Sequence, residues 1–247
     1  MAEEKVTITT ADGDCPAYVF TPDEPGRHPG TILYMDAFGM RPTIIEMGRR
    51  LASDGYVVLV PDLFYRAGEY GPLDPTAAFS SGDVMGALGQ IRGTTDNRRA
   101  AVDSEAFLDY LASRDDVEGT RVGLTGYCMG GAVALTVAGT YPDRVAAVGA
   151  FHTGGVITDS ELSPHRVAPN ITATVYLGGA DHDPGYTPEI AAEFDELLTN
   201  AGVAHRSEIY PDARHGYTMK DFPVYDENAN ERHWRELESL FARALKD

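Results

Sequence analysis

The chain has 247 residues, 43% of them hydrophobic, and carries a formal net charge of −18 at pH 7. A surface this acidic repels nucleic acid and anionic membranes, so we expect neither as a partner. The length and apolar content suit one α/β domain, which we predict over residues 1–247.

Cysteine usage and the N-terminal segment predict a cytoplasmic protein. The two cysteines, Cys15 and Cys128, are too few for a disulfide framework, as expected in a reducing compartment. Residues 1–5 have neither the apolar core nor the basic leader of a signal peptide. No apolar run reaches the ~18 residues that a membrane-spanning helix needs.

Short apolar runs alternate with amphipathic segments along the chain. Strands are predicted, in chain order, at 6–9, 17–20, 30–35, 56–60, 121–125, 145–151, 174–177 and 205–210. Helices are predicted at 43–53, 96–113, 132–138, 188–200 and 232–245. The Asp12-Gly13 turn predicts a hairpin between the first two strands, and the later alternation predicts an α/β fold with a mostly parallel central sheet and helices on both faces.

Residues 64–94 differ from the rest of the chain. They are rich in Gly, Pro, Tyr and Arg and lack strong periodicity, although 83–91 could form a short helix. Long excursions of this kind within a compact domain are usually functional. We therefore predict a lid or pocket-covering segment here.

The stretch 126–131, Gly-Tyr-Cys-Met-Gly-Gly, has the pattern of a nucleophile elbow with Cys128 in the place usually held by Ser. A predicted strand precedes it and a predicted helix follows it, as the elbow requires. The N-terminus of that helix would direct N–H groups and partial positive charge at the sulfur, which favours the thiolate. The alternative is that Cys128 is simply a small buried apolar residue.

A cysteine nucleophile needs a base, and the base needs an orienting acid. Two loops at the carboxyl ends of predicted strands offer them: 178–183 carries Asp181 and Asp183, and 211–217 carries His215. We predict His215 as the base and Asp181 as its partner, with Asp183 as the alternative acid. Each could instead be an ordinary loop residue.

Acyl transfer also needs N–H donors for the developing oxyanion. The N–H of Met129 follows the nucleophile, and the loop after the predicted strand 30–35 supplies Ala37 as the second candidate. Asp36 beside it could accept a hydrogen bond from the Cys128 thiol. Alternatively, Asp36 caps a turn or pairs with Arg41.

No cofactor or metal is expected. The sequence contains neither a dinucleotide-binding glycine motif nor a P-loop, and the acidic and histidine residues near 181–183 are better explained as acid and base than as ligands. Candidate walls of a substrate pocket are Phe38, Tyr65, Tyr70 and His152, each of which could equally be plain core or surface, together with Met219.

At the elbow, at the Gly178-Gly179-Ala180-Asp181-His182 loop and at His215-Gly216, the chain resembles the dienelactone hydrolase (carboxymethylenebutenolidase-like) family of the α/β-hydrolase superfamily. The resemblance runs along nearly the whole chain, includes 56–64, and implies the α/β-hydrolase fold. It implies a triad of Cys128, Asp181 and His215.

Two positions depart from the family pattern. Where the family has a Glu that holds and then deprotonates the thiol, this chain has Asp36, which is one methylene shorter. Members that cleave dienelactone have an Arg four residues after the catalytic His to grip a substrate carboxylate, whereas this chain has Met219.

The function expected from these features is hydrolysis of a small-molecule ester or lactone through Cys128. A homodimer is the expected assembly only because homodimers are the most frequent oligomers in general. The alternative is a non-catalytic ligand-binding or thiol-sensing protein of the same fold, favoured by Asp36 and by the missing Arg. A redox enzyme is disfavoured because no C-x-x-C motif occurs.

Overall fold

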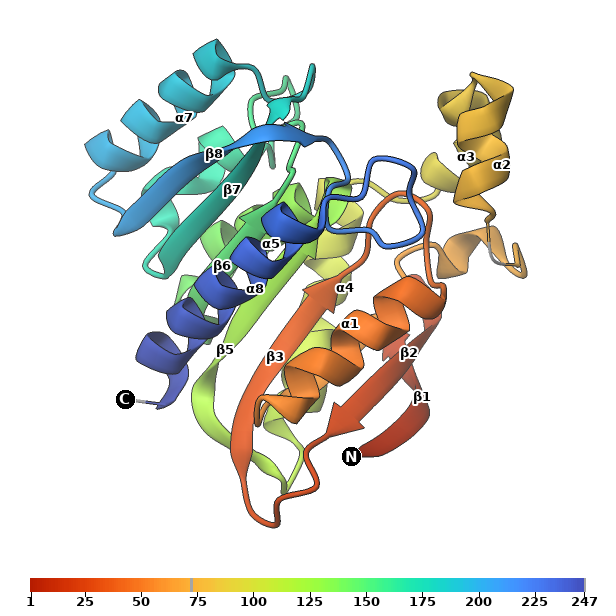
Figure 1. Cartoon of the computed structure of the whole chain (residues 1–247). Helices are drawn as coiled ribbons and strands as arrows, with labels where there is room; N and C mark the ends of the chain where they lie inside the picture. Colours follow the sequence, from red (N-terminus) through yellow and green to blue (C-terminus); the bar gives the residue numbers. More distant parts are fainter. Residues whose placement is uncertain (72, 247) are drawn as a thin grey trace.

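The structure is a computed structural model that describes residues 1–71 and 73–246. Its core is an eight-stranded sheet with the order β1-β2-β4-β3-β5-β6-β7-β8 (Figure 1). The strands are β1 Ala2–Thr10, β2 Gly13–Thr21, β3 His28–Tyr34, β4 Val57–Pro61, β5 Val117–Tyr127, β6 Val145–Phe151, β7 Thr174–His182 and β8 His205–Arg214. The pairs β1–β2 and β2–β4 are antiparallel, and the pairs from β4 through β8 are parallel.

Helices cover both faces of this sheet. They are α1 Pro42–Ser53, α2 Pro75–Ser81, α3 Val84–Arg92, α4 Asn97–Ala112, α5 Met129–Thr140, α6 Pro164–Val167, α7 Pro188–Asn200 and α8 Glu227–Phe241, with short helical turns at Tyr65–Ala67, Pro142–Arg144, Ala168–Asn170 and Ala242–Lys246. Helices α1 and α8 lie on one face, and α4 and α5 lie on the other (Figure 1). The central strands are therefore buried on both faces, which explains their continuous apolar runs.

The predicted α/β class is confirmed, and the predicted strands and helices all occur. The strand 145–151 and the helix 188–200 have the predicted ends, whereas the other elements are shifted at one or both ends. The last helix begins at Glu227 rather than at residue 232, because the Asp226 carboxylate caps it by accepting a hydrogen bond from the Ala229 N–H. Strands β7 and β8 run four or more residues beyond their predicted ends. Apolar periodicity could not show this because the added residues are Gly, Ala, Pro or polar, with no large apolar side chain among them.

The predicted excursion at 64–94 contains more helix than expected. Helix α2 was not predicted, yet Asp74 caps its N-terminus and Gly82 ends it in the left-handed conformation. Helix α3 confirms the predicted short helix and is kinked at Gly89. Part of the excursion, Pro72, lies outside the described residues. The two helices project beyond the sheet near the loop that follows β8 (Figure 1).

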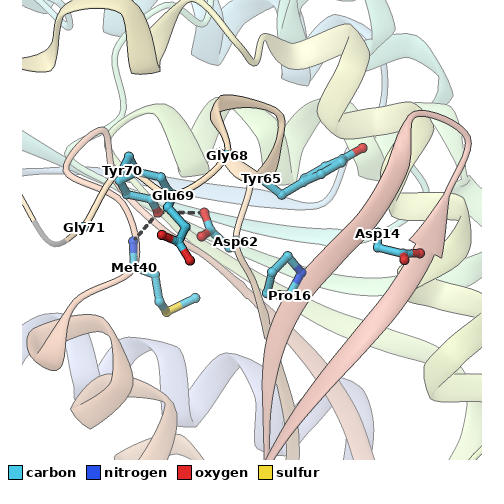
Figure 2. A pocket seen from close by; sticks show the side chains of 9 residues that line it. All are labelled: Asp14, Pro16, Met40, Asp62, Tyr65, Gly68, Glu69, Tyr70 and Gly71. Atoms are coloured by element: carbon cyan, nitrogen blue, oxygen red, sulfur yellow. Dashed lines mark hydrogen bonds between the residues drawn. The ribbon is translucent and has the colours of Figure 1, made fainter.

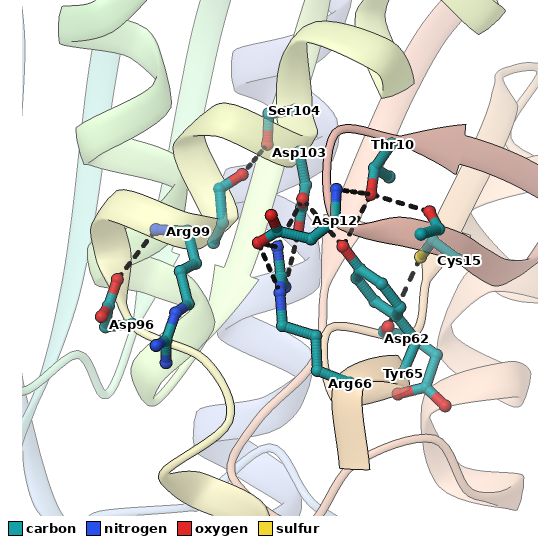
Figure 3. Close-up of polar contacts among 12 residues, drawn as sticks. Thr10, Asp12, Cys15, Asp62, Tyr65, Arg66, Asp96, Arg99, Asp103 and Ser104 are labelled. Carbon is teal, nitrogen blue, oxygen red and sulfur yellow. Dashed lines mark hydrogen bonds and ion pairs between the residues drawn. The ribbon is translucent and has the colours of Figure 1, made fainter. Parts of the chain in front are cut away.

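A buried ionic cluster fastens the start of the excursion to the body of the protein. Arg66 donates two hydrogen bonds to Asp103 of α4, at 2.8 and 2.9 Å, and a third to Asp12 of the first hairpin (Figure 3). The Tyr65 hydroxyl donates to Asp103 and also pairs with Thr10. Because the Asp103 side chain is fully buried, its charge depends on these partners.

Within residues 1–71 and 73–246, every helix is too short or too polar to cross a bilayer.

Candidate active site

Cys128 lies at the bend between β5 and α5, with φ 55° and ψ −118°. A positive φ is strained for any residue with a side chain, and such strain is characteristic of functional positions. The bend is held by a hydrogen bond from the Cys128 N–H to the Phe151 carbonyl, at 3.1 Å. The elbow therefore presents the sulfur at the carboxyl end of the sheet.

Two glycines make this bend possible. A Cβ at Gly126 would overlap the Gly130 carbonyl, and a Cβ at Gly130 would overlap the backbone of Tyr34 on β3. The elbow helix can therefore start directly against the ends of β3 and β5 only with glycine at both places. The Met129 N–H belongs to the first turn of α5, and N–H groups in the first turn of a helix have no acceptor within the helix.

His215, in the loop after β8, is oriented by Asp183. The His215 Nδ1 lies 2.6 Å from the Asp183 Oδ2, and the Asp183 side chain is almost fully buried. The other Asp183 oxygen accepts a hydrogen bond from the Gly185 N–H at 2.8 Å. This leaves the Nε2 edge of the imidazole for a second partner.

Cys128 is that second partner, because its charge and hydrogen bonding raise the pKa of His215. Burial lowers the pKa of His215, but the charge of the Cys128 thiolate, and hydrogen bonding to Asp183 and Cys128, outweigh burial and raise it to about 10. The protonated imidazole is thus stabilised between two anions. His215 therefore couples the Cys128 sulfur to the Asp183 carboxylate.

The predicted pairing of Asp181 with His215 is wrong in this geometry, and the alternative, Asp183, holds the position. Strand β7 continues through His182, so Asp181 is still part of the strand and is exposed. Its carboxylate accepts only a 3.2 Å hydrogen bond from the Asp212 N–H. Asp183 is the first residue beyond the strand and turns inward.

Asp181, His182 and Asp212 form an exposed group whose potential ligand atoms lie within 4.8 Å of one another. These three could hold a divalent cation by ligand type. All three are solvent-exposed, however, and exposed carboxylates commonly gather without a metal. They lie outside the Cys128–His215–Asp183 assembly.

Ala37 lies in the turn after β3, beside the elbow because β3 and β5 are paired neighbours through Tyr34 and Gly126. In the same turn, the Phe38 and Gly39 N–H groups donate to Asp36. The Ala37 N–H has no acceptor among the described residues. It is therefore available for a ligand oxygen.

Asp36 is engaged by Arg41 and not by the thiol. Both carboxylate oxygens accept hydrogen bonds from the Arg41 guanidinium, at 2.7 and 2.8 Å, and both side chains are buried. Of the three predicted arrangements for Asp36, the structure shows the turn cap, through the Phe38 N–H, and the pairing with Arg41. The shorter side chain of Asp compared with Glu fits this fork geometry.

Tyr65 and Tyr70, predicted as pocket walls, line a cleft of about 600 Å³ at the carboxyl end of β4 (Figure 2). Its remaining walls include Asp62 and Glu69, and Cys128 and His215 are not among its lining residues. The Tyr70 hydroxyl donates to Asp62 at 2.8 Å and accepts from the Met40 N–H. Tyr70 thus holds the segment after Gly39, next to the candidate site, whereas the Tyr65 hydroxyl contacts Thr10 and Asp103.

The other predicted pocket residues are buried. His152 and Met219 have no solvent-exposed surface, so neither lines an open pocket here. The His152 ring packs 5.2 Å from that of His215 and contacts the Thr218 hydroxyl at 2.7 Å. Burial, and then the charge of His215, lower the pKa of His152 well below its usual value. A neutral His152 supports the imidazole of His215 without competing for its proton.

Phe38 packs edge-on against Phe222, and both contact Phe79 of α2. This aromatic trio joins the loop after β3, the loop after β8 and the predicted lid. Phe79, Phe222 and Asp221 were not predicted as site residues. The sequence signal for Asp221 and Phe222 is their place in the loop that carries His215, and that for Phe79 is its place within the predicted cover 64–94.

The two cysteines should react differently with alkylating reagents. Cys15 is fully buried, and burial together with the charges of Asp62 and Asp103 raises the pKa of its thiol. Cys128 is partly exposed and lies beside an imidazolium. We expect iodoacetamide at neutral pH to add one group per folded chain, on Cys128, as measured by peptide mass spectrometry. Labelling of Cys15 in the folded protein would contradict this.

Comparison with known proteins decides the family. A model of the dienelactone hydrolase family matches residues 15–245. The chain belongs to the dienelactone hydrolase family. A carboxymethylenebutenolidase of Pseudomonas sp. strain P51 is 28% identical over 206 residues, which cover 83% of this chain and 80% of the relative.

Solved structures show the same fold. A provisionally named dienelactone hydrolase from Klebsiella pneumoniae has a TM-score of 0.86 at 22% identity, covering 98% of both chains. The dienelactone hydrolase-like promiscuous phosphotriesterase P91 from metagenomic libraries has a TM-score of 0.78 at 24% identity, covering 99% of this chain and 98% of that one. The predicted family and α/β-hydrolase fold are confirmed, and with them a hydrolase acting on ester or lactone bonds.

Proposed function

We propose that this family member hydrolyses carboxylic esters or lactones by covalent catalysis, with Cys128 as nucleophile, His215 as acid and base, and Asp183 as the residue that orients His215. The observation that carries the proposal is the contact of His215 with Asp183 on one side and its charge coupling to Cys128 on the other. The same three roles recur in hydrolases of unrelated folds.

The first half-reaction forms a thioester. The Cys128 thiolate attacks the carbonyl carbon, and a tetrahedral oxyanion develops. When that intermediate collapses, the carbon–oxygen bond to the leaving alcohol breaks and His215 gives its proton to the alkoxide. Asp183, held by the Gly185 N–H, keeps the imidazole in the orientation needed for this transfer.

The second half-reaction releases the acid. Once the thiolate has become a thioester, the anion that most favoured the protonated imidazole is gone, and His215 can accept a proton from water. The resulting hydroxide attacks the thioester, the carbon–sulfur bond breaks with the sulfur leaving as a thiolate, and His215 keeps the proton it took from water. Each cycle consumes one water and restores the starting ion pair.

The oxyanion in both steps would be bound by the N–H groups of Met129 and Ala37. Met129 begins α5, so its N–H and the helix dipole favour negative charge at the same point. The Ala37 N–H is free of other acceptors among the described residues. Preorganised donors of this kind contribute roughly 10²–10³-fold each to kcat.

The residues around the site favour an uncharged substrate. Met219 is buried where dienelactone-cleaving relatives are expected to have an anion-binding Arg, and Arg41 is fully occupied by two carboxylates. We propose residues 64–94 as the cover of the pocket, because Phe79 of α2 packs against Phe38 and Phe222 beside the triad. A panel of small neutral aryl and alkyl esters and lactones tests the function directly.

The protonation of His215 gives a further prediction. Its pKa of about 10 lies above the unfolded value near 6.5, so this interaction stabilises the fold below pH 6.5 and the stabilisation is lost as pH rises through 10. We expect the imidazole to titrate near pH 10 by NMR. In Cys128→Ala it should titrate at much lower pH, because the thiolate charge is removed while burial remains. An unchanged titration in the variant would show that no thiolate–imidazolium pair exists.

A further inference from the structure

One buried arginine joins the loops on either side of the candidate triad. The Arg41 side chain is 2% exposed, and its Nη1 and Nη2 atoms donate to Asp36, directly before Ala37. Its Nε donates at 2.6 Å to Asp221, which lies in the same loop as His215. Arg41 therefore connects the loop that offers the oxyanion donor with the loop that carries the base.

Two aromatic rings pack against the same guanidinium. The Arg41 Cζ lies 5.7 Å from the Phe38 ring centroid and 5.2 Å from that of Phe222. Phe79 of α2 packs against both rings, at 6.0 and 5.2 Å. Only a planar, delocalised cation can bind a carboxylate with its edge and stack on rings with its faces, so Lys is not equivalent here.

The backbone that carries Arg41 is also anchored. Met40 is held through its N–H by the Tyr70 hydroxyl, which in turn donates to Asp62 at the end of β4 (Figure 2). Helix α1 begins immediately after Arg41. The backbone of Arg41 is thus held in place, and the two flanking loops pack against its guanidinium.

The charge of Arg41 matters as much as its shape. Without Arg41, Asp36 would place an uncompensated negative charge directly before Ala37, the proposed oxyanion donor, and Asp221 would add a second one on the other side of the guanidinium. A guanidinium between them compensates one charge and fixes the other by hydrogen bonds. Without it, the carboxylates would repel each other and the oxyanion.

We propose that Arg41 is a positioning residue for hydrolysis: it holds the Ala37 N–H and the His215 loop in mutual register and shields the oxyanion site from the Asp36 carboxylate. This inference rests on the proposed function, since it assigns Arg41 to the oxyanion step of that reaction. It does not require Arg41 to touch the substrate.

The test uses two readouts on the full chain. Ester hydrolysis needs the oxyanion donors, whereas alkylation of Cys128 by iodoacetamide needs only the thiolate. For Arg41→Lys we expect kcat to fall roughly 10²-fold, the effect of displacing a reacting group by about 1 Å, with a smaller change in KM. The alkylation rate should stay within about threefold of wild type, because the Cys128–His215 pair is left intact.

Asp221→Asn provides a second variant that keeps the buried Arg41–Asp36 pair, so it remains informative if Arg41→Lys does not fold. Here we expect kcat to fall roughly tenfold, again with alkylation preserved. The matched control is Arg114→Lys, because Arg114 also makes a two-point contact with an Asp, Asp116, and lies over an aromatic ring, Tyr110, but at the amino end of β5, away from the site. It should lower the melting temperature and leave kcat within about twofold of wild type.

The inference is overturned if hydrolysis and alkylation fall together in Asp221→Asn and in folded Arg41→Lys, which would mean a purely structural role. It is also overturned if kcat is unchanged in both, or if Arg114→Lys lowers kcat as much as Arg41→Lys does. A wild-type protein whose ester hydrolysis does not depend on Cys128 would refute the proposed function itself. That outcome is visible before any Arg41 variant is compared.

Discussion

Cys128→Ala is expected to lower kcat/KM for a small aryl ester by at least about 10³-fold, because removal of a nucleophile leaves only the contributions of oxyanion donors and substrate binding. The side chain is partly exposed and bears no hydrogen bond on which the fold depends, so the variant should fold normally. Initial rates on a panel of esters and lactones, with circular dichroism as a fold check, give the measurement.

The chain supplies its own matched control in Cys15. Cys15→Ala removes the other thiol, which lies in the core near Asp62, and should cost stability while leaving kcat/KM within about twofold of wild type. Equal hydrolysis by Cys128→Ala and wild type would end the proposed mechanism. Stoichiometric alkylation of Cys128 without turnover on any ester would instead favour the thiol-sensing alternative.

Asp183→Asn is expected to lower kcat by roughly 10³–10⁴-fold. An amide in this position can donate to the His215 Nδ1 and thereby stabilise the wrong tautomer, which is the effect seen when the orienting acid of such triads is changed to its amide. The loss should appear mainly in kcat, because Asp183 is buried behind the imidazole and is too enclosed to contact substrate.

Asp181→Asn is the control for this change, because Asp181 lies two residues before Asp183, near the end of β7. Asp181 is exposed and its one contact is a long hydrogen bond from the Asp212 N–H, so we expect kcat within about threefold of wild type. A large loss in Asp181→Asn together with near-normal activity in Asp183→Asn would reverse our assignment of the acid.

Local patterns were sufficient to predict the elbow. The spacing of Gly126, Cys128 and Gly130 between an apolar strand and an apolar helix has one good structural solution, and the structure confirms the strand, the helix and the strained bend between them. The position of His215 at the end of a strand followed from the same topological rule.

The acid could not be chosen by such reasoning. Asp181 and Asp183 are both polar residues after the same apolar run, and the choice depends on where β7 ends. The strand pairs with β8 as far as His182 through an irregular register, which is a property of two segments distant in sequence. Only the folded sheet shows that Asp183 is the first residue free to turn toward His215.

The contact of Arg41 with two carboxylates could not be predicted from the sequence either. Arg41 and Asp36 are five residues apart, and their pairing was among the predicted alternatives for Asp36. Arg41 and Asp221 are 180 residues apart. No periodicity or spacing links such partners, because the sheet brings the loops after β3 and β8 together only in the folded chain. Helix α2 was missed for a simpler reason, since seven residues are too few to show helical periodicity.

The most direct measurement is mass spectrometry of the protein quenched during turnover of an ester with a bulky, slowly released acyl group. The account predicts an added mass equal to that acyl group on the peptide containing Cys128, accumulating within the first turnover and absent in Cys128→Ala. Active turnover with no acyl group on Cys128, or with the acyl group on another residue, would contradict it.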